Sequence, residues 1–478
     1  MILWGYLSAI GYGLLCLLLA MLAYKLGMPK KYSRKLVHIL VGAEWIILWQ
    51  FMGATVHFLI VCLGFTALLL ISHLKKIMPM ISSDGDNAPG TVYYGVAMSI
   101  MSFICLFVPD MMLPFGIGVF ATSVGDGFAG IVGQAIKRFN PTVFKNKTLF
   151  GSIANFAFSS LTAIVFKYAL DMPLAIWQCF AIGIFSAGIE LITGFGLDNI
   201  AITVGTAFLA FAFVEFSFIN GYVVPIVLTP LVIAAVLQKK VLTNNGLLLA
   251  MILDAVVSLV LGNFGFVMLC VFLFGSVIID KIKKRKRKDD GITKKGECRD
   301  GIQVIANGLI PMVMALLFSA TSHPAFLVGY VAALAEAFAD TAASGLGVYS
   351  DDVFDIFRFK RTKAGLSGGM TVIGTVAALV GAVFASFVAF AFGIFSIWGV
   401  LIAAACAFAG TVFDSFLGSL LQVKYRCSVC GEVTEREVHC NKPVKRCSGF
   451  EFFDNDVVNL LSGAFAATLA SFIVFIIG

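Results

Sequence analysis

The chain has 478 residues, of which 60% are hydrophobic and only 13% are charged. Soluble domains average about 25% charged residues, so this composition excludes a soluble globular protein and indicates one that crosses a membrane many times. The formal net charge is +7, and we expect membrane lipid but no nucleic acid among the partners.

Apolar segments long enough to cross about 30 Å of hydrocarbon follow one another along the chain. Because lipid requires every backbone group to be paired internally, we interpret these segments as helices. The first lacks a basic region before it and is followed by several lysines, which favours a retained helix over a cleaved signal peptide. We predict sixteen transmembrane helices, near residues 2–23, 36–52, 55–74, 91–108, 112–135, 149–170, 174–193, 198–214, 217–237, 244–261, 264–280, 301–320, 324–344, 369–393, 397–421 and 456–477.

The positions of the basic residues test this prediction. With the N-terminus outside, every second loop should be cytoplasmic and rich in Lys and Arg. Those loops hold all of the 34 Lys and Arg residues except Lys167, whereas the opposite loops are short and almost without cations. A single missed helix would invert every later loop, so the pattern favours an all-α polytopic membrane protein with both termini outside.

Two segments carry the same polar pattern in the same register. Counted from Asp126 and from Asp340, an alanine falls at +3, a glycine at +7, a basic residue at +21, a threonine at +22 and a glycine at +25. These Asp residues end the fifth and the thirteenth predicted helices, which both run inward. The sequence therefore predicts two parallel repeats of eight helices, 1–216 and 217–478.

Acidic side chains inside apolar helices are costly and are site candidates by default. Asp126, Glu190, Asp340 and Asp414 are predicted one to two helical turns inside the cytoplasmic face, a depth that suits a substrate with a water-soluble head and a lipid tail. Carboxylates with Lys, Arg and helix-opening glycines can hold Mg²⁺ and the phosphates of a nucleoside triphosphate. The simpler alternative is that the basic loops only orient the helices and the glycines only permit close packing.

One predicted cytoplasmic loop, 424–453, is rich in cysteine and contains His439. The cytoplasm is reducing, which disfavours a disulfide framework there. Four soft ligands from this loop could close a structural zinc site. The candidate ligands are Cys427, Cys430, Cys440 and Cys447.

Motifs in the first half resemble those of a known family. They are Ser33-Arg34-Lys35-Leu36-Val37-His38, Gly90-Thr91-Val92-Tyr93-Tyr94, Gly125-Asp126-Gly127-Phe128-Ala129 with Gly133, and Lys147-Thr148-Leu149-Phe150-Gly151-Ser152, with Glu190 and Asp198-Asn199. Through them, residues 1–215 resemble the CTP-dependent polyprenol kinases, which include phytol kinase and dolichol kinase. The resemblance implies that the first half phosphorylates an isoprenoid alcohol with CTP.

The second half, residues 225–478, resembles the phytyl-phosphate kinase family. The motifs are Arg299 with Gln303-Val304-Ile305-Ala306-Asn307-Gly308, Ala339-Asp340-Thr341, Gly365-Leu366-Ser367-Gly368-Gly369, Asp414-Ser415, and Asn455-Asp456 with Asn459. This resemblance implies that the monophosphate is phosphorylated to the diphosphate. Where the family usually has Glu after Ala-Ser, this chain has Gly345, so either Glu336 supplies that charge or the second half has a weaker metal site.

The motifs and the two resemblances together assign candidate roles. Mg²⁺ is expected on Asp126, Glu190, Asp198, Asp340, Asp414 and Asp456. Catalytic roles are expected for Asp126, His38, Lys147, Asp340, Arg361 and Lys363. Contacts to substrate and nucleotide are expected from Arg34, Lys35, Arg138, Gly151, Ser152, Asn199, Arg299, Gln303, Asn307, Gly368, Gly369, Ser415, Asn455 and Asn459.

The two resemblances together imply a two-step kinase of the cell membrane with CTP as donor, and the basic loops predict that its sites lie on the cytoplasmic face. Its substrates would be an isoprenoid alcohol and the corresponding monophosphate. A cytidylyltransferase that makes a CDP-lipid has a similar basic loop, but the later His-Gly-Gly signature of such enzymes is absent from the sequence. A transporter also has parallel repeats, although its polar groups would lie near the bilayer midplane.

Overall fold

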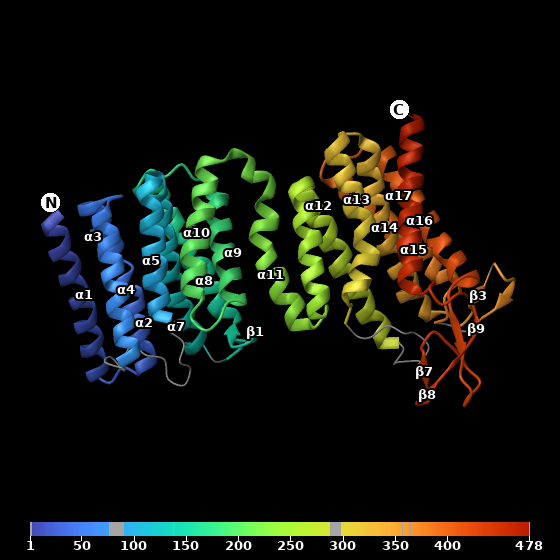
Figure 1. Ribbon diagram of the computed structural model, residues 1–478, viewed down its shortest axis with the longest axis horizontal. Coiled ribbons are helices and arrows are strands. Elements are labelled where there is room, and N and C mark those ends of the chain that lie inside the picture. The colour runs from blue at the N-terminus through green and yellow to red at the C-terminus, as the bar shows by residue number, and fades with distance from the viewer. Residues whose placement is uncertain are drawn as a thin grey trace. The chain divides into compact units, whose positions relative to one another are not determined.

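The computed structural model describes residues 2–75, 90–136, 138–286, 298–355, 357–362 and 365–477, except for the side chains of residues 30, 31 and 34. The described chain is almost entirely helical, with short strands in its loops (Figure 1). It divides into two compact units, Met1–Lys239 and Lys240–Gly478. The all-α polytopic fold predicted from the sequence is confirmed.

The first unit is a bundle of apolar helices. Its most buried span is the continuous segment Pro109–Ala135. The helical elements are α1 (Ile2–Lys25), α2 (Lys30–Val41), α3 (Glu44–Met52), α4 (Val56–Lys75), α5 (Gly90–Phe107), η1 (Pro109–Met111), α6 (Met112–Phe120), η2 (Ala121–Asp126), α7 (Gly127–Ala135), α8 (Leu149–Ala169), α9 (Ile176–Ile192), α10 (Asp198–Glu215), η3 (Ser217–Tyr222) and α11 (Val223–Lys239). Of these, η2 is a π-helical segment and packs against α2, α8 and α10.

The second unit is built around α14 (Pro324–Leu346), its most buried span. The other helical elements are α12 (Asn244–Lys286), α13 (Gly301–Thr321), η4 (Gly347–Tyr349), α15 (Val372–Ala391), α16 (Ile397–Leu420) and α17 (Asn455–Ile477). All five long helices pack against α14, and small residues allow this close approach. A Cβ on Gly381 of α15, for example, would stand 3.3 Å from the Cα of Ala339.

Fourteen helical segments of the described residues are long and apolar enough to cross a membrane. The predicted spans 244–261 and 264–280 both fall in α12, whose backbone leaves helical geometry at Gly262 (φ 57°, ψ −140°). The predicted span 174–193 corresponds to α9, an apolar helix of 17 residues. Every predicted span thus coincides with helix, while sixteen membrane crossings and the placement of both termini stay predictions.

Helix starts at the repeated motifs agree with the sequence. The helices α5, α10, α13 and α17 begin at Gly90, Asp198, Gly301 and Asn455. The domain boundary differs, because α11 packs against α9 and the first unit extends to Lys239 rather than to residue 216. Residues 217–239 are as apolar as the helices around them, so no change in composition marks the boundary.

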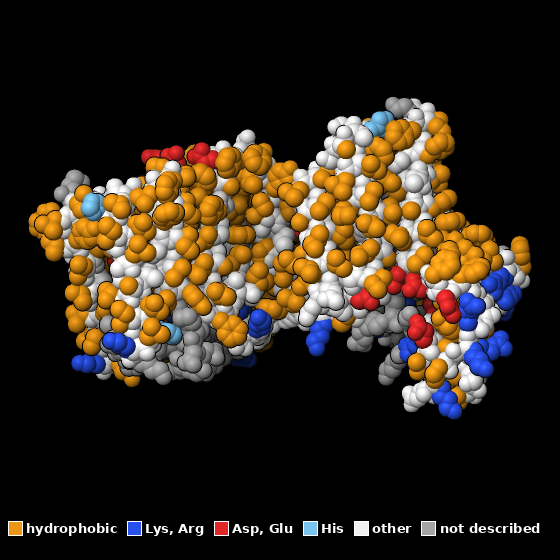
Figure 2. All heavy atoms as spheres, in the orientation of Figure 1, with side chains coloured by type: hydrophobic (Ala, Val, Ile, Leu, Met, Phe, Trp, Pro, Cys, Tyr) orange, Lys and Arg blue, Asp and Glu red, His pale blue; other side chains and the backbone are white. Residues whose placement is uncertain are grey.

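Hydrophobic side chains cover the flanks of both units in the view of Figure 2. In the first unit, the Lys and Arg side chains seen in this view lie at the end that carries the short strand β1 (Thr142–Phe144). An apolar flank and one cationic end are the features of a bundle that is embedded in a membrane and oriented by its basic loops.

Short antiparallel hairpins follow the helices that bear the two repeated Asp residues. The strand β1 pairs with β2 (Lys147–Thr148) before α8, and β3 (Phe354–Asp355) pairs with β4 (Lys360–Arg361) before α15. The cysteine-rich loop forms a separate set of strands, with β5 (Lys424–Arg426) between β6 (Val433–Thr434) and β9 (Lys445–Ser448), and with β7 (Val438–His439) paired to β8 (Lys442–Pro443). The two units therefore share a hairpin at the equivalent place in the chain.

Candidate functional site

Asp126 is the centre of a buried ionic cluster in the first unit. It ends the π-helical segment η2, and its side chain is 9% exposed. The Lys35 ammonium of α2 donates to Oδ2 of Asp126 at 2.7 Å and to its backbone carbonyl at 3.2 Å. Nε2 of His38, one turn further along α2, lies 3.5 Å from Oδ2 of Asp126 and 3.1 Å from the Thr122 carbonyl. Single π-helical turns are frequent at functional sites, which fits the position of Asp126.

Lys147 pairs with two further carboxylates and interacts electrostatically with Asp126. Its ammonium donates to Oε1 of Glu190 at 2.8 Å and lies 3.4 Å from Oδ2 of Asp198. Glu190 lies near the end of α9 and is buried, and its Oε2 has no hydrogen-bond partner among the described residues. We call the following set the Asp126 cluster: Lys35, His38, Asp126, Lys147, Glu190 and Asp198.

The Asp126 cluster combines three carboxylates with two ammonium groups. Burial alone lowers the pKa of Lys147, but the charges of Glu190, Asp126 and Asp198 outweigh burial and hold this pKa above its ordinary value. Lys147 therefore remains charged at physiological pH. Carboxylate oxygens are the ligands that Mg²⁺ takes, and ammonium groups can neutralise phosphate oxygens.

Small residues let α2 lie directly on the segment that bears Asp126. A Cβ on Gly42 would collide with Ser123, and a Cβ on Gly130 would collide with the aliphatic stem of Lys35. Because Gly130 has no side chain, Lys35 can pass over its backbone to reach Asp126. These glycines allow two helices to pack closely rather than contacting phosphate. This agrees with the simpler interpretation of the glycines in the sequence, in which they only permit close packing.

Other residues predicted for the first site surround the Asp126 cluster. Asn199 donates from Nδ2 to the Gly90 carbonyl at 2.8 Å and so ties the start of α10 to the start of α5. Gly151 lies in the first turn of α8, where a Cβ would stand 3.1 Å from the Ala129 carbonyl of α7. The Oγ of Ser152 is buried and has no partner among the described residues, so it is a polar group that a substrate could satisfy.

Arg138 does not join these residues. It is exposed, and its guanidinium lies over the Phe139 ring. The side chain of Arg34 lies outside the described residues. Sequence reasoning missed Tyr94, whose ring centroid is 5.9 Å from that of His38 and whose buried hydroxyl has no partner among the described residues. Its place in the Gly-Thr-Val-Tyr-Tyr motif was the available signal.

Acidic side chains of the second unit also interact with one another. Glu336 and Asp340 lie one turn apart on α14, and Glu336 interacts electrostatically with Asp340 and with Asp414 of α16. Ser462 of α17 donates to Oδ2 of Asp414 at 3.4 Å. Glu336 is 2% exposed, and its Oε1 has no hydrogen-bond partner among the described residues. We call Glu336, Asp340 and Asp414 the Glu336 cluster.

Gly345, where the resembling family usually has Glu, faces α12. A Cβ at this position would collide with Ile279 of that helix, so a glutamate has no room here. Glu336 lies two turns earlier on the same helix and brings a carboxylate to Asp414. The arrangement supports the alternative in which Glu336 supplies the missing charge.

The basic residue of the second repeat is placed differently from its counterpart in the first. Lys147 reaches the acids, whereas Arg361 is 83% exposed and lies 3.5 Å from the exposed Asp352. The cause is local, because α8 begins directly after β2, whereas α15 begins at Val372, well beyond β4. The longer segment after β4 lets Arg361 face away, so the catalytic role predicted for Arg361 finds no support here.

The other predicted cations of the second half are also separate from the Glu336 cluster. Arg299 donates to Asp280 of α12 at 3.2 Å and lies over the Phe272 ring. Lys363 lies outside the described residues. The structure therefore links Asp340 and Asp414 electrostatically to Glu336, whereas Arg299 and Arg361 pair with Asp280 and Asp352.

Gly368 and Gly369, predicted to contact substrate and nucleotide, precede α15 and do not open it. The helix α15 begins later, and Thr371 caps it by accepting from the Gly374 N–H at 3.0 Å. Gly368 has a left-handed backbone (φ 85°), and a Cβ there would stand 2.5 Å from the Ser419 backbone. Gly368 thus lets this loop pack against α16, whereas a Cβ on Gly369 would stand 2.7 Å from Cγ1 of Val353.

The remaining polar candidates lie near the starts of α13 and α17 and near the end of α16. Asn307 donates to the Gln303 carbonyl at 2.8 Å in α13, and Asn455 donates to Oδ1 of Asn459 at 3.2 Å in α17. Asp456 lies in the first turn of α17, and Ser415 follows Asp414 on α16. All six candidates in these helices are half-buried.

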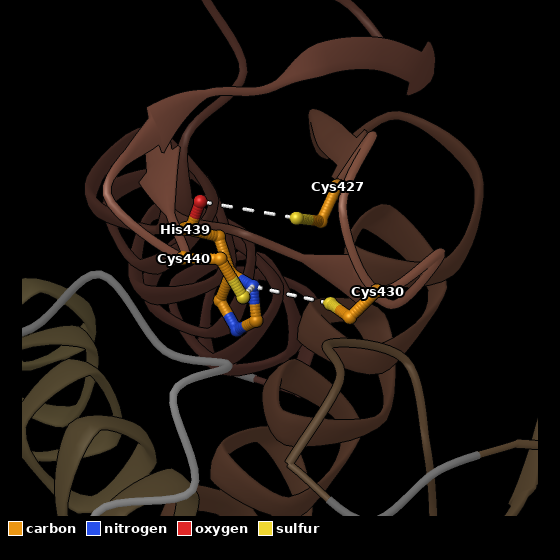
Figure 3. A group of neighbouring side chains, drawn as sticks. All are labelled: Cys427, Cys430, His439 and Cys440. Carbon is orange, nitrogen blue, oxygen red and sulfur yellow. Dashed lines mark hydrogen bonds between the residues drawn. The ribbon is translucent and has the colours of Figure 1, made fainter.

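The cysteine-rich loop gathers a ligand set that differs from the predicted one. Cys427, Cys430, His439 and Cys440 come together, as Figure 3 shows. Cys447 does not belong to this group, because its Sγ lies 3.3 Å from the Lys424 carbonyl at the base of the β5–β9 pair. Strand pairing explains this difference. Cys447 is held in β9, and the β7–β8 hairpin places His439 beside the other cysteines.

We expect replacement of Lys147 by methionine to reduce any phosphoryl transfer in the first unit about 10²-fold or more, because Glu190 and Asp198 lose their buried counter-charge. The raised pKa keeps this charge in place at every pH below about 10.4, so Lys147 should contribute no pH dependence between pH 6 and 9. Product formation over that pH range is the measurement. Lys145→Met, on the exposed turn of the same hairpin, is the matched control and should retain activity.

Comparison with known proteins places the second half in a family. Residues 227–467 match the model of the family described as integral membrane protein DUF92. The chain belongs to this family. A multi-pass membrane location follows for this DUF92 protein, in agreement with its many apolar helices.

Individual relatives match less than half of this chain, at 27–29% identity. A phytol kinase of Synechocystis sp. is 28% identical over 194 residues, which cover 38% of this chain and 80% of the relative. An uncharacterized membrane protein of Methanocaldococcus jannaschii is 29% identical over 201 residues, 40% of this chain and 80% of that protein. Protein PGR of Arabidopsis thaliana is 27% identical over 242 residues, 45% of this chain and 83% of that protein. No solved structure matches this chain.

Proposed function

We propose that this chain is an integral membrane lipid kinase that phosphorylates an isoprenoid alcohol of the phytol or geranylgeraniol type with CTP. The observation that carries the proposal is the Asp126 cluster, in which three carboxylates and two ammonium groups meet between apolar helices. Such a cluster is costly to bury and therefore marks a functional site. The similarity to a protein named phytol kinase supports the same class of reaction.

Mg²⁺ is usually held by one or two carboxylates together with substrate phosphates, and the Asp126 cluster offers carboxylates of this kind. Asp126, Glu190 and Asp198 would hold the ion, and Oε2 of Glu190 is a buried oxygen that has no hydrogen-bond partner among the described residues. When bound, Mg²⁺ would neutralise negative charge on the phosphate groups of the substrates.

The side chains of this chain would do the rest by position and charge. Lys35 and Lys147, already held by carboxylates, would neutralise the phosphoryl group as it moves to the alcohol. Asp126 or His38 would accept the alcohol proton. Because the Thr122 carbonyl can only accept a hydrogen bond, Nε2 of His38 carries a proton, and Nδ1 is the nitrogen that could take one.

For the second unit we propose phosphorylation of the monophosphate to the diphosphate. The Glu336 cluster supplies converging acids, with Asp456 as a further candidate ligand for Mg²⁺. Fusion of the two units would keep a membrane-held intermediate close to the second site. Because of the basic loops, we propose that both sites lie on the cytoplasmic face of the cell membrane.

Purified protein in detergent, incubated with Mg²⁺, geranylgeraniol and radiolabelled CTP, tests this function. Label from the γ-phosphate should appear in a lipid monophosphate and a lipid diphosphate. Lipid labelled from the α-phosphate would instead identify a CDP-lipid-forming cytidylyltransferase. No labelled lipid with prenols of several lengths would contradict the kinase and favour a transporter.

A further inference from the structure

The cysteine-rich loop brings four metal-binding side chains to one point. The ligand atoms of Cys427, Cys430, His439 and Cys440 all lie within 4.8 Å of one another (Figure 3). Nδ1 of His439 is 3.5 Å from Sγ of Cys430 and 3.3 Å from Sγ of Cys440. Ligand atoms of a tetrahedral zinc site stand about 3.5–3.8 Å apart, given bonds of about 2.3 Å to sulfur and about 2.0 Å to nitrogen. The separations to His439 are therefore close to those of a zinc tetrahedron.

The first pair of ligands is presented by a tight turn after β5. The N–H of Val429 donates to Sγ of Cys427 at 3.4 Å, a bond that favours the thiolate over the thiol. The Gly431 N–H donates to the Cys427 carbonyl at 3.0 Å, and Gly431 has a left-handed backbone (φ 75°). This turn points the sulfurs of Cys427 and Cys430 to the same side.

The second pair lies at the tip of the β7–β8 hairpin. Cys440 (φ 51°) and Asn441 (φ 57°) are its two loop residues, and a type I′ turn requires positive φ at both positions. A cysteine at such a position carries backbone strain, which persists where the surroundings demand it, as in a ligand clamp. The turn sets Cys440 beside His439 and opposite the first pair.

We propose that Zn²⁺ binds Cys427, Cys430, His439 and Cys440 and thereby folds the loop 424–453. The strands of this loop are only two to four residues long, and most of its side chains are half-buried or exposed. Such a segment has too little apolar surface to fold by itself, and a closed tetrahedral site of thiolates and imidazole supplies the missing free energy. The site is structural, because all four coordination positions are filled by the protein.

The β5–β6 hairpin, which bears the first ligand pair, is also hydrogen-bonded to another loop of the unit. Lys424 and Glu435 lie at the base of the β5–β6 hairpin, whose tip carries Cys427 and Cys430. Glu435 accepts from the Ser367 N–H at 2.9 Å and from its hydroxyl at 2.6 Å, and Lys424 donates to the Ser367 carbonyl at 2.8 Å. All three polar groups of Ser367 are thus held by residues that the zinc site orients.

These hydrogen bonds connect the proposed zinc site to α16 of the second unit. Ser367 precedes Gly368, which packs against the Ser419 backbone of α16, and α16 also carries Asp414. Zinc binding therefore fixes the 365–369 loop against α16, the helix that contributes Asp414 to the Glu336 cluster. Lys424 and Glu435 are positioning residues in this arrangement.

Metal content of the purified full-length protein tests the zinc site, and this readout is independent of any kinase activity. Protein purified under reducing conditions should contain about one zinc per chain by mass spectrometry of the metal. Cys430→Ser and Cys440→Ser should each lose most of the zinc. Cys447→Ser is the matched control, since it removes a cysteine of the same loop outside the ligand set, and it should keep the zinc.

Cobalt exchange and hydrogen exchange complete the test. Co²⁺ bound in place of zinc should give thiolate-to-cobalt charge-transfer absorption that weakens in Cys430→Ser and not in Cys447→Ser. The Ser367 amide should exchange at least about tenfold faster in Cys430→Ser, because its acceptor Glu435 is no longer held. Wild-type protein with free thiols and no zinc, another metal in its place, or equal zinc loss in Cys447→Ser would each overturn the proposal.

Discussion

Replacing Asp126 with asparagine is expected to abolish phosphorylation of the isoprenoid alcohol, with a loss of about 10³-fold or more. Asparagine keeps the shape of the side chain but removes the charge that Lys35 contacts at 2.7 Å and His38 at 3.5 Å. It also removes a carboxylate ligand from the proposed Mg²⁺ site. Initial rates of transfer from γ-labelled CTP to geranylgeraniol in detergent measure the effect.

Asp110→Asn is the matched control for this experiment. Asp110 lies at the other end of the same helical segment and is exposed, so its replacement should leave the rate unchanged. Size-exclusion profiles of the two variants should coincide with that of the unchanged protein. Normal turnover by folded Asp126→Asn would show that the reaction centre lies elsewhere.

Replacing Asp340 with asparagine is expected to leave lipid monophosphate as the end product. Asp340 belongs to the Glu336 cluster of the second unit, whereas the Asp126 cluster belongs to the first unit. Formation of the diphosphate should fall about 10²-fold or more while formation of the monophosphate continues, because only one of the two sites loses a carboxylate. Chromatography of the labelled lipids over time separates the two products.

The exposed Asp352 provides the control in the second unit. Asp352→Asn removes the partner of the exposed Arg361, and an exposed ion pair contributes about 0–1 kcal/mol, so both products should form as before. Supplying geranylgeranyl monophosphate directly bypasses the first unit. If Asp340→Asn converted that lipid to the diphosphate at the normal rate, the second site would not include Asp340.

Much of the first site could be predicted from sequence because its signals are local. An Asp inside an apolar helix, a basic residue just before the next helix and an acid at a helix start are each visible in the residue order. Membrane helices must also pair their own backbone groups, so apolar length alone locates them. Asp126, Lys147, Glu190 and Asp198 therefore appeared as candidates before any of their contacts were known.

The same local signals failed where the distance between elements matters. Lys147 and Arg361 occupy equal positions in the repeated pattern, yet only Lys147 reaches the acids, because α8 follows its hairpin at once and α15 does not. Cys447 looked like a metal ligand from composition, but pairing of β5 with β9 holds it elsewhere. Register within a motif does not determine where a loop directs its side chains.

The sequence by itself determined the membrane-spanning helical class, the two repeated acidic motifs and most of the helix starts, because hydropathy and helix-opening residues act over short stretches of chain. Only the tertiary structure decided that Lys35 and His38 of α2 meet Asp126, that Glu336 of α14 interacts with Asp414 of α16, and that His439 joins the cysteine cluster. These contacts join residues far apart in the chain. Helix packing and strand pairing bring them together, and the order of residues within a motif does not encode either.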